Sequence, residues 1–357
     1  MTTAYINRIA TAVPPNDVHE PFVRYAQSLF HDDDRRSNLL AGIAERAGID
    51  HRYSFLSANE DPEARALDSD CFYVRGEFPN TAARMRLFES WAPALAAQTI
   101  DRLNLAADRE QITHLLITCC TGFSAPGLDL EIVERCRLPG SVERTMIGFM
   151  GCYAAINALK LARHIVRSEP AARVLIVNLE LCTLHFNETT DLSQLICFLL
   201  FADGCAACLV TSQPSGIALD SFRAVLVPGT RDLMAWHIRD FGFDMVLSGQ
   251  VPTAIHDALR LNVNEILAAA PARSIDLWAV HPGGRSIIDA VQQAFDLAPA
   301  ALSNSRDILR RYGNMSSATV MFVLQSLMAS AHKAATGCAM SFGPGLIAET
   351  MLFRTGA

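Results

Sequence analysis

The chain has 357 residues, of which 50% are hydrophobic and 19% are charged, and its formal net charge is −7. This composition supports a large hydrophobic core and argues against an intrinsically disordered chain, and the negative charge disfavours nucleic acid as the main partner. From the length we expect about two domains or one large duplicated domain.

The N-terminal segment MTTAYINRIATAVPP has no long apolar stretch behind basic residues, so we expect no signal peptide and a cytoplasmic location. Residues 192–210 are the most apolar segment, but Asp203 and Gly204 interrupt it, which favours buried elements over a membrane span. Most of the ten cysteines lie in apolar runs and are expected to be free thiols. The spacing Cys205-x-x-Cys208 has no second pair or histidine cluster beside it, so we expect a buried strand and no bound metal.

The predicted elements begin with a polar segment, residues 16–79, which is expected to be helical and to pack outside the core. Buried strands are predicted from the apolar, β-branched runs in residues 113–122 and 172–182. Between them an apolar, strand-like run ends at Gly151, and Cys152 follows at the start of a predicted helix. Later in the chain we expect strands at residues 207–213 and 216–227 and a helix with one apolar face at residues 253–269. A tight loop is expected at residues 343–345, before a final strand.

A repeat relates the two parts of the chain. The runs THLLITCCTG and IDLWAVHPGG each read as an apolar strand followed by a turn, and their first residues, Thr113 and Ile275, lie 162 residues apart. Gly151 and Gly313, which each precede a predicted helix start, are separated by the same 162 residues. We therefore expect two similar halves, residues 1–215 and 216–357.

The repeat brings three chemically versatile residues together. Cys152 and Asn314 occupy equivalent helix starts, and His281 follows the strand of the second half. A helix dipole and a neighbouring imidazolium lower the pKa of a thiol, and the thiolate then attacks an acyl group and holds it covalently. His281 and Asn314 are suited to donate hydrogen bonds to a carbonyl oxygen that becomes negative in the transition state.

Each of these residues also has a purely structural interpretation. Cys152 can be a buried thiol, His281 a hydrogen-bonded residue at a strand end, and Asn314 a helix N-cap. A papain-like protease also uses Cys, His and Asn, but it carries its cysteine near the mature N-terminus and contains disulfides, and neither feature fits this sequence.

Five sequence motifs, in chain order, resemble those of one family: GFMGCYAAINALKLA, LLFADGCAA, WAVHPGG, RYGNMSSA and SFGPGL. They are similar to the motifs of type III polyketide synthases, also called chalcone synthase-like enzymes. The resemblance implies an α/β thiolase-like fold with a duplicated, five-layer αβαβα core, and a homodimer.

The resemblance also implies a mechanism. Cys152 would accept a starter acyl group from acyl-CoA, and His281 and Asn314 would stabilise the enolate that forms when malonyl-CoA loses carbon dioxide. Phe201 would be the gatekeeper between the CoA tunnel and the cavity. No metal or organic cofactor is implied, because CoA thioesters already carry the activation.

Six positions that shape the cavity of the plant enzymes differ in this chain. Chalcone synthase has Thr, Met, Thr, Thr, Gly and Phe where this sequence has Cys120, Ala125, Cys182, His185, Trp236 and Met245. The small Cys120 and Ala125 are expected to make room for an alkyl chain, and Trp236 is expected to fill space. The run NLELCTLHF is similar to bacterial members that make alkylpyrones, alkylresorcinols or tetrahydroxynaphthalene, so we expect a fatty acyl starter and a pyrone or resorcinol product.

The expected contacts of CoA are Arg46, Arg52 and Arg285, together with Ser316, whose hydroxyl is expected to face the substrate. Two alternatives remain open. A ketoacyl-ACP synthase III-like condensing enzyme uses the same Cys, His and Asn but takes an acyl carrier protein. A paralogue without activity would act as a binding or scaffold subunit.

Overall fold

Strands that are buried on both faces form the centre of the fold. All residues of β4 (His114–Cys119), β6 (Val174–Leu181) and β7 (Asp203–Thr211) are buried, as expected for strands that lie between layers of helices. The structure is a computed structural model that describes residues 2–330 and 334–356.

One hydrogen-bonded ladder of nine strands runs through the molecule in the order β11-β12-β13-β8-β1-β7-β6-β4-β5. Between β1 and β8 it is joined only by the pairs Tyr5↔Ala218 and Ile6↔Ile217, so the ladder divides there into two sheets. The remaining strands are β1 (Tyr5–Ala12), β5 (Glu143–Gly148), β8 (Ile217–Leu226), β11 (Leu277–Val280), β12 (Ala335–Gly343) and β13 (Ile347–Thr355).

The two sheets repeat one strand order. The first sheet runs β1-β7-β6-β4 and the second runs β8-β13-β12-β11, and in both of them the last two strands are parallel. The connection between β7 and β8, residues 212–216, contains the predicted division at residues 215 and 216. We propose that the two halves meet at this connection.

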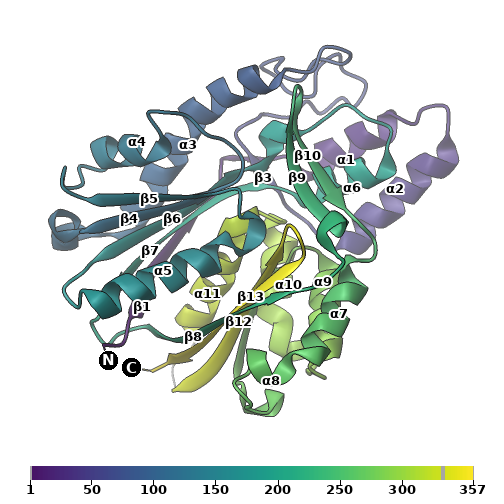
Figure 1. Cartoon of the computed structure of the whole chain (residues 1–357). Helices are drawn as coiled ribbons and strands as arrows, with labels where there is room; N and C mark the ends of the chain where they lie inside the picture. The colour runs from purple at the N-terminus through teal and green to yellow at the C-terminus, as the bar shows by residue number, and fades with distance from the viewer. Residues whose placement is uncertain (1, 331–333, 357) are drawn as a thin grey trace.

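Helices complete a five-layer arrangement (Figure 1). The middle layer consists of α5 (Ala154–Ser168) and α11 (Thr319–Ser330), whose apolar side chains share one buried cluster with strands of both sheets. One outer face is covered by α3 (Thr81–Leu103) and α4 (Leu128–Arg135). The other is covered by α7 (Val251–Leu261), α9 (Arg285–Ala294) and α10 (Ser303–Tyr312). The α/β fold class predicted from the sequence is confirmed.

A peripheral unit packs beside these layers. It contains α1 (His19–Ser28), α2 (Asp34–Ala47) and α6 (Leu192–Leu200), which share a fourth apolar cluster. The prediction that residues 16–79 are helical holds only for α1 and α2. β2 (Asn16–Asp17) pairs with β3 (Tyr53–Ser54), and residues 48–79 contain no helix. The backbone after β3 forms loops instead, because the buried carboxylate of Asp68 accepts hydrogen bonds from the backbone N–H groups of residues 70, 72 and 73.

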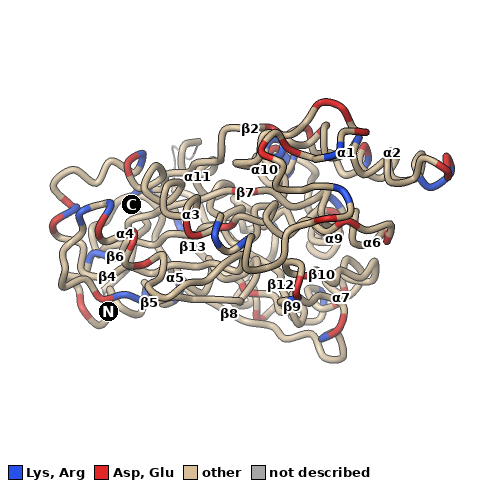
Figure 2. The backbone as a smooth tube through the Cα atoms, turned by 90° about the horizontal axis from the view of Figure 1, so that it is seen from above, with Lys and Arg blue, Asp and Glu red and all other residues tan. Residues whose placement is uncertain are grey.

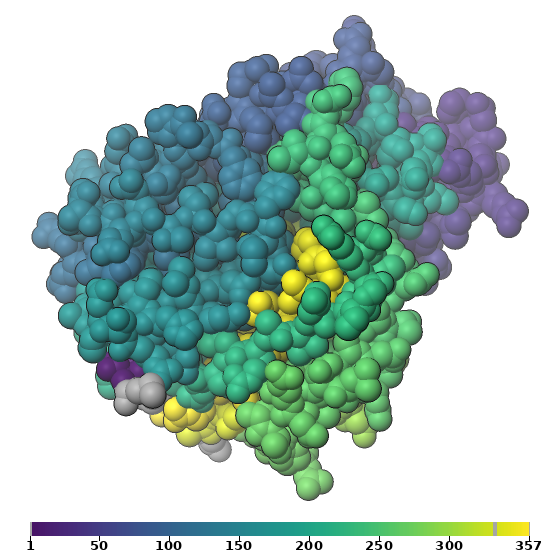
Figure 3. All heavy atoms as spheres, in the orientation of Figure 1, coloured from purple at the N-terminus to yellow at the C-terminus, as the bar shows by residue number. Residues whose placement is uncertain are grey.

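The structure shortens one predicted helix and adds a hairpin that the sequence did not predict. The helix expected over residues 253–269 ends at Asn262, whose side chain donates to Ala258 O, and a short α8 (Val263–Ile266) follows. A hairpin of β9 (Met234–Arg239) and β10 (Gly242–Leu247) projects from the second half toward the first, and the two halves meet beneath it along a seam (Figures 1 and 3).

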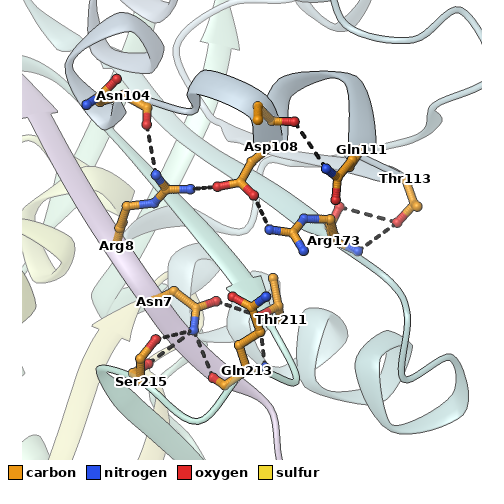
Figure 4. Close-up of polar contacts among 11 residues, drawn as sticks. Asn7, Arg8, Asn104, Asp108, Gln111, Thr113, Arg173, Thr211, Gln213 and Ser215 are labelled. Atoms are coloured by element: carbon orange, nitrogen blue, oxygen red, sulfur yellow. Dashed lines mark hydrogen bonds and ion pairs between the residues drawn. The ribbon is translucent and has the colours of Figure 1, made fainter.

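Polar contacts hold the end of the first sheet that is farthest from the hairpin (Figure 4). Asp108 forms ion pairs with both Arg8 of β1 and Arg173, which precedes β6. Asn7 bonds to Thr211 and to residues 213 and 215 in the connection to β8. Viewed from above, charged residues of both signs lie at the outer end of α2 (Figure 2). No helix in the described part of the chain is long and apolar enough to cross a membrane.

Candidate active site

Cys152 lies on a short turn that links an edge strand to the middle layer. The turn, Gly151–Tyr153, leads directly into α5, and only 7% of Cys152 is exposed. Gly151 has φ +73°, and a Cβ on it would lie 2.2 Å from Pro344 Cδ. Only glycine fits this close approach and this backbone conformation, so Gly151 allows Cys152 to lie against the β12–β13 loop.

The second half contributes Asn314 and Ser316 to the same place. The Cys152 Sγ is 3.7 Å from Ser316 Oγ, and the Asn314 side chain also hydrogen-bonds the thiol. Asn314 Oδ1 accepts from Ser316 N at 2.9 Å, and its Nδ2 donates to Gly283 O at 3.2 Å. Residues separated by more than 150 positions therefore meet at one point, between the starts of α5 and α11.

His281 follows β11 and lies next to Gly283, the residue whose carbonyl accepts from Asn314. Its backbone N–H donates to Met340 O at 2.8 Å, which continues the β11–β12 pairing by one residue. A Cβ on Gly283 would be 3.6 Å from His281 Nε2. Both ring nitrogens are buried and have no hydrogen-bond partner among the described residues, so the interpretation of His281 as a hydrogen-bonded strand-end residue does not fit.

Burial opposes ionisation of both groups. It raises the pKa of the Cys152 thiol to about 12, although hydrogen bonding with Ser316 and Asn314 acts in the opposite direction. Burial also lowers the pKa of His281 to about 3. A lowered thiol pKa was expected from the helix dipole and an imidazolium. By these values the thiol of Cys152 and the imidazole of His281 are each neutral at pH 7.

An apolar cavity opens beside Cys152. Five of the predicted cavity residues line it: Cys120, Cys182, Phe201, Trp236 and Met245. The rest of its wall comes from Thr121, Gly151, Met234, Ser316 and Pro344. Met234, Trp236 and Met245 belong to the β9–β10 hairpin, so this peripheral element forms one wall of the cavity.

Two predicted cavity residues lie elsewhere. Ala125 is exposed and lines a different surface groove together with Phe88 and Leu128, so within this chain it does not shape the space around Cys152. His185 is fully buried behind Trp236, with the two ring centroids 5.5 Å apart. Its Nε2 donates to Thr121 O at 2.7 Å and its ring stacks on Phe243 at 3.9 Å, so His185 supports the wall without reaching the cavity.

Sequence reasoning missed Glu180, which lies beneath the cavity. Its carboxylate is fully buried and accepts hydrogen bonds from Cys120 N, Thr121 Oγ1 and Ser317 Oγ. Burial raises its pKa to about 7. A single acidic residue within the apolar run VLIVNLEL was the available indication, because an unpaired carboxylate is rarely buried without a specific role.

The residues expected to contact CoA do not form one group. Arg46 and Arg285 are exposed neighbours, since Arg285 Nη1 donates to Arg46 O at 3.4 Å. Arg52 is fully buried, and its guanidinium donates to backbone carbonyls in the interior, where a CoA phosphate does not reach. Ser316 contacts the nucleophile instead of a phosphate position. No group of three or more potential metal ligands occurs among the residues that the structure describes.

The chain matches two sequence profiles along nearly its whole length. Residues 3–214 match the N-terminal domain of chalcone and stilbene synthases, and residues 218–356 match the C-terminal domain. The chain belongs to the chalcone and stilbene synthase family. As a type III polyketide synthase it is an acyltransferase with the thiolase-like fold described above.

Individual relatives support this assignment. The chain is 32% identical to "Alpha-pyrone synthesis polyketide synthase-like Pks18" of Mycobacterium tuberculosis, covering 99% of this chain and 91% of the relative. It is 31% identical to bisdemethoxycurcumin synthase of Oryza sativa subsp. japonica, covering 98% of this chain and 92% of that relative. The crystal structure of PKS-I from the brown alga Ectocarpus siliculosus superposes with a TM-score of 0.87 at 29% identity, covering 100% of this chain and 99% of that one.

Proposed function

We propose that this polyketide synthase loads a starter acyl group from acyl-CoA on Cys152 and extends it with malonyl-CoA. The observation that carries the proposal is the contact of Cys152 with Ser316 at the wall of an apolar cavity, with Asn314 beside both residues. A thiol with hydrogen-bond donors beside it is the arrangement that acyl transfer through a covalent thioester requires. A scaffold role would not require these three residues to converge.

The loading step needs a base for the thiol proton. Because burial keeps His281 neutral and leaves its ring nitrogens without partners, one of them is an available acceptor. The Cys152 sulfur attacks the thioester carbonyl as the proton moves to His281. CoA leaves as a thiol after taking that proton, and the acyl group stays on Cys152.

The extension step develops negative charge on a carbonyl oxygen. Loss of carbon dioxide from malonyl-CoA leaves the enolate of acetyl-CoA, whose carbon attacks the Cys152 thioester and releases the sulfur. The side-chain amide of Asn314 and the imidazole of His281 are the groups placed to donate to the enolate oxygen. Asn314 is held in orientation by its bonds to Gly283 and Ser316.

The size of the cavity limits the starter. The lining is apolar and includes the bulky side chains of Phe201, Met234 and Trp236. We propose an alkylpyrone-type product from a short-chain acyl-CoA, which agrees in ring type with the name of Pks18. A longer, fatty acyl starter requires Trp236 to move.

Two further features belong to this proposal. The exposed Arg46 and Arg285 form a basic pair suited to CoA phosphates. The edge of β5 is unpaired, and Met146 on it is 37% exposed, beside Phe123 at 40%. An unpaired edge that carries an exposed apolar side chain such as Met146 is a template for pairing with a second copy, so we propose a homodimer joined at β5. Light scattering measures the mass, and Met146→Asp is expected to shift it to that of one chain.

The decisive experiment incubates the purified protein with a series of acyl-CoA starters and isotope-labelled malonyl-CoA, with products read by mass spectrometry. Labelled pyrones that carry the starter's alkyl group are the expected result. Parallel reactions with malonyl-ACP address the ketoacyl-ACP synthase alternative. Activity confined to malonyl-ACP would replace the proposal, and absence of any Cys152 adduct would favour the scaffold role.

A further inference from the structure

Arg52 is a fully buried cation beneath the gatekeeper residue. Its backbone is fixed on both sides: its N–H donates to Asp17 Oδ1 at 3.2 Å, and its carbonyl accepts from Val18 N at 2.8 Å. Burial lowers the pKa of Arg52 to about 10, so the guanidinium is still charged at neutral pH. Removing a charge from water is expensive unless its hydrogen bonds are recovered inside the protein.

The hydrogen bonds of this guanidinium converge on the end of α6. Arg52 Nη1 donates to Phe198 O at 2.8 Å and to Phe201 O at 2.9 Å, while Nε donates to His19 Nδ1 at 2.9 Å. The last carbonyls of a helix have no partner within the helix and carry the negative end of its dipole. A cation at this position satisfies the carbonyl of Phe198, in the last turn of α6, and the carbonyl of Phe201, which follows the helix.

The same backbone segment is paired with the asparagine. Asn314 N donates to Leu200 O at 2.9 Å, and Ala202 N donates to Asn314 O at 2.9 Å, so Phe201 and Asn314 form a single parallel bridge. The aliphatic stem of Arg52 completes the contact from below. A Cβ on Gly313 would lie only 2.8 Å from Arg52 Cγ. Arg52 therefore contacts both members of the bridge or their immediate neighbours.

We propose that Arg52 is a positioning residue for malonyl-CoA decarboxylation, which rests on the function proposed above. It fixes the end of α6, and through the Phe201–Asn314 bridge it fixes the donor that faces the enolate oxygen. Loss of its two carbonyl bonds leaves Phe198 O and Phe201 O without their charged donor and releases the bridge. Acylation of Cys152 depends mainly on the thiol and its base, and Asn314 contributes to it only through its hydrogen bond with the thiol, so acylation is less sensitive to this change than decarboxylation.

The experiment compares Arg52→Met with Arg84→Met. Arg84 is a matched control, because it is also fully buried and also donates to backbone carbonyls, those of Pro79, Leu184 and Phe186. None of these three residues lines the cavity. Three quantities are measured for each variant and the wild type: the melting temperature, the rate of Cys152 acylation by a starter acyl-CoA, and kcat and KM for carbon dioxide release from malonyl-CoA.

We expect both variants to lose stability to a similar extent. Only Arg52→Met should lose kcat for decarboxylation, by roughly 10- to 100-fold, since a misplacement of about 1 Å can cost 100-fold. Its acylation rate should stay within about threefold of wild type, and Arg52→Lys, which keeps a cationic donor, should recover part of the loss.

Several results would overturn the inference. One is an equal loss of decarboxylation in Arg52→Met and Arg84→Met, which indicates general destabilisation. Another is a raised KM with unchanged kcat, which indicates direct contact with CoA. If Arg52→Met does not fold, Arg52→Lys is measured alone, and kcat equal to that of wild type rejects the role. Failure of the wild type itself to decarboxylate malonyl-CoA rejects the proposed function instead.

Discussion

Replacing Trp236 by alanine should lengthen the starter that the enzyme accepts. The indole forms part of the cavity wall, and its Nε1 donates to Cys120 O at 2.8 Å. Edge-to-face contacts join it to His185 at 5.5 Å and to Phe243 at 5.7 Å. These contacts hold the β9–β10 hairpin over the cavity, so the change removes both the bulk of the wall and its attachment.

The magnitude follows from the contacts and from the space released. One hydrogen bond of about 1 kcal/mol and two aromatic contacts of about 0.5–1.5 kcal/mol each suggest a loss of stability of roughly 2–4 kcal/mol. Alanine removes about nine ring atoms, which at roughly 30 Å³ each is space for several methylenes. If four further methylenes of a starter become buried, at about 0.8 kcal/mol each, kcat/KM for the longer starter rises by roughly 200-fold relative to a short one.

The assay is kcat/KM for acyl-CoA starters of increasing chain length, with malonyl-CoA saturating. Trp236→Phe is the matched control, because it keeps an aromatic ring in the wall and loses only the N–H donor to Cys120 and part of the bulk. We expect the control to retain the wild-type preference for short starters. Identical chain-length profiles for the wild type and Trp236→Ala would refute the assignment of Trp236 as the limiting wall.

Three other substitutions test the chemistry directly. Asn314→Ala should slow carbon dioxide release from malonyl-CoA by about 100- to 1000-fold, the usual effect of removing one oxyanion donor, and an unchanged rate would remove Asn314 from the mechanism. Cys152→Ala should abolish both the acyl adduct seen by mass spectrometry and all chain extension; any labelled product contradicts this. His281→Ala should slow iodoacetamide alkylation of Cys152 at pH 7 by at least tenfold, with the rate still rising at high pH, because burial alone holds the thiol pKa near 12. Superimposable pH profiles for the two proteins would exclude His281 as the proton acceptor.

The fold was largely predictable because its buried strands correspond to runs of mostly apolar residues in the sequence. β4 and β6 are buried along their whole length and mostly apolar, and the equal spacing of Gly151 and Gly313 indicated a repeat before any contact was known. The hairpin β9–β10 was not predicted. Its alternation of buried and exposed residues is interrupted, and its position depends on contacts such as Trp236 with Cys120 that no local pattern encodes.

The site was predictable as a set of residue types, whereas the environment of each residue was not. Arg52 lies in the run DHRYS, which has the appearance of a basic surface segment, yet it is fully buried. Ala125 aligns with a cavity position but is exposed in this chain. Burial arises from packing between distant segments, so a sequence shows which groups are available and leaves open how far each one is from water.

Burial is the main energetic obstacle to forming the thiolate of Cys152. A shift in the pKa of Cys152 from 9 to about 12 corresponds to roughly 4 kcal/mol against the thiolate. A helix dipole contributes about 0.3–1 kcal/mol, and at most about 2 in partly buried sites, so the start of α5 does not offset this cost. A contact between opposite charges is worth about 4 kcal/mol at an effective dielectric constant of 20. We propose that the imidazole of His281 supplies such a charge by taking the thiol proton. The thiolate and the imidazolium would then form together, and His281 would be needed for loading Cys152 as well as for stabilising the enolate.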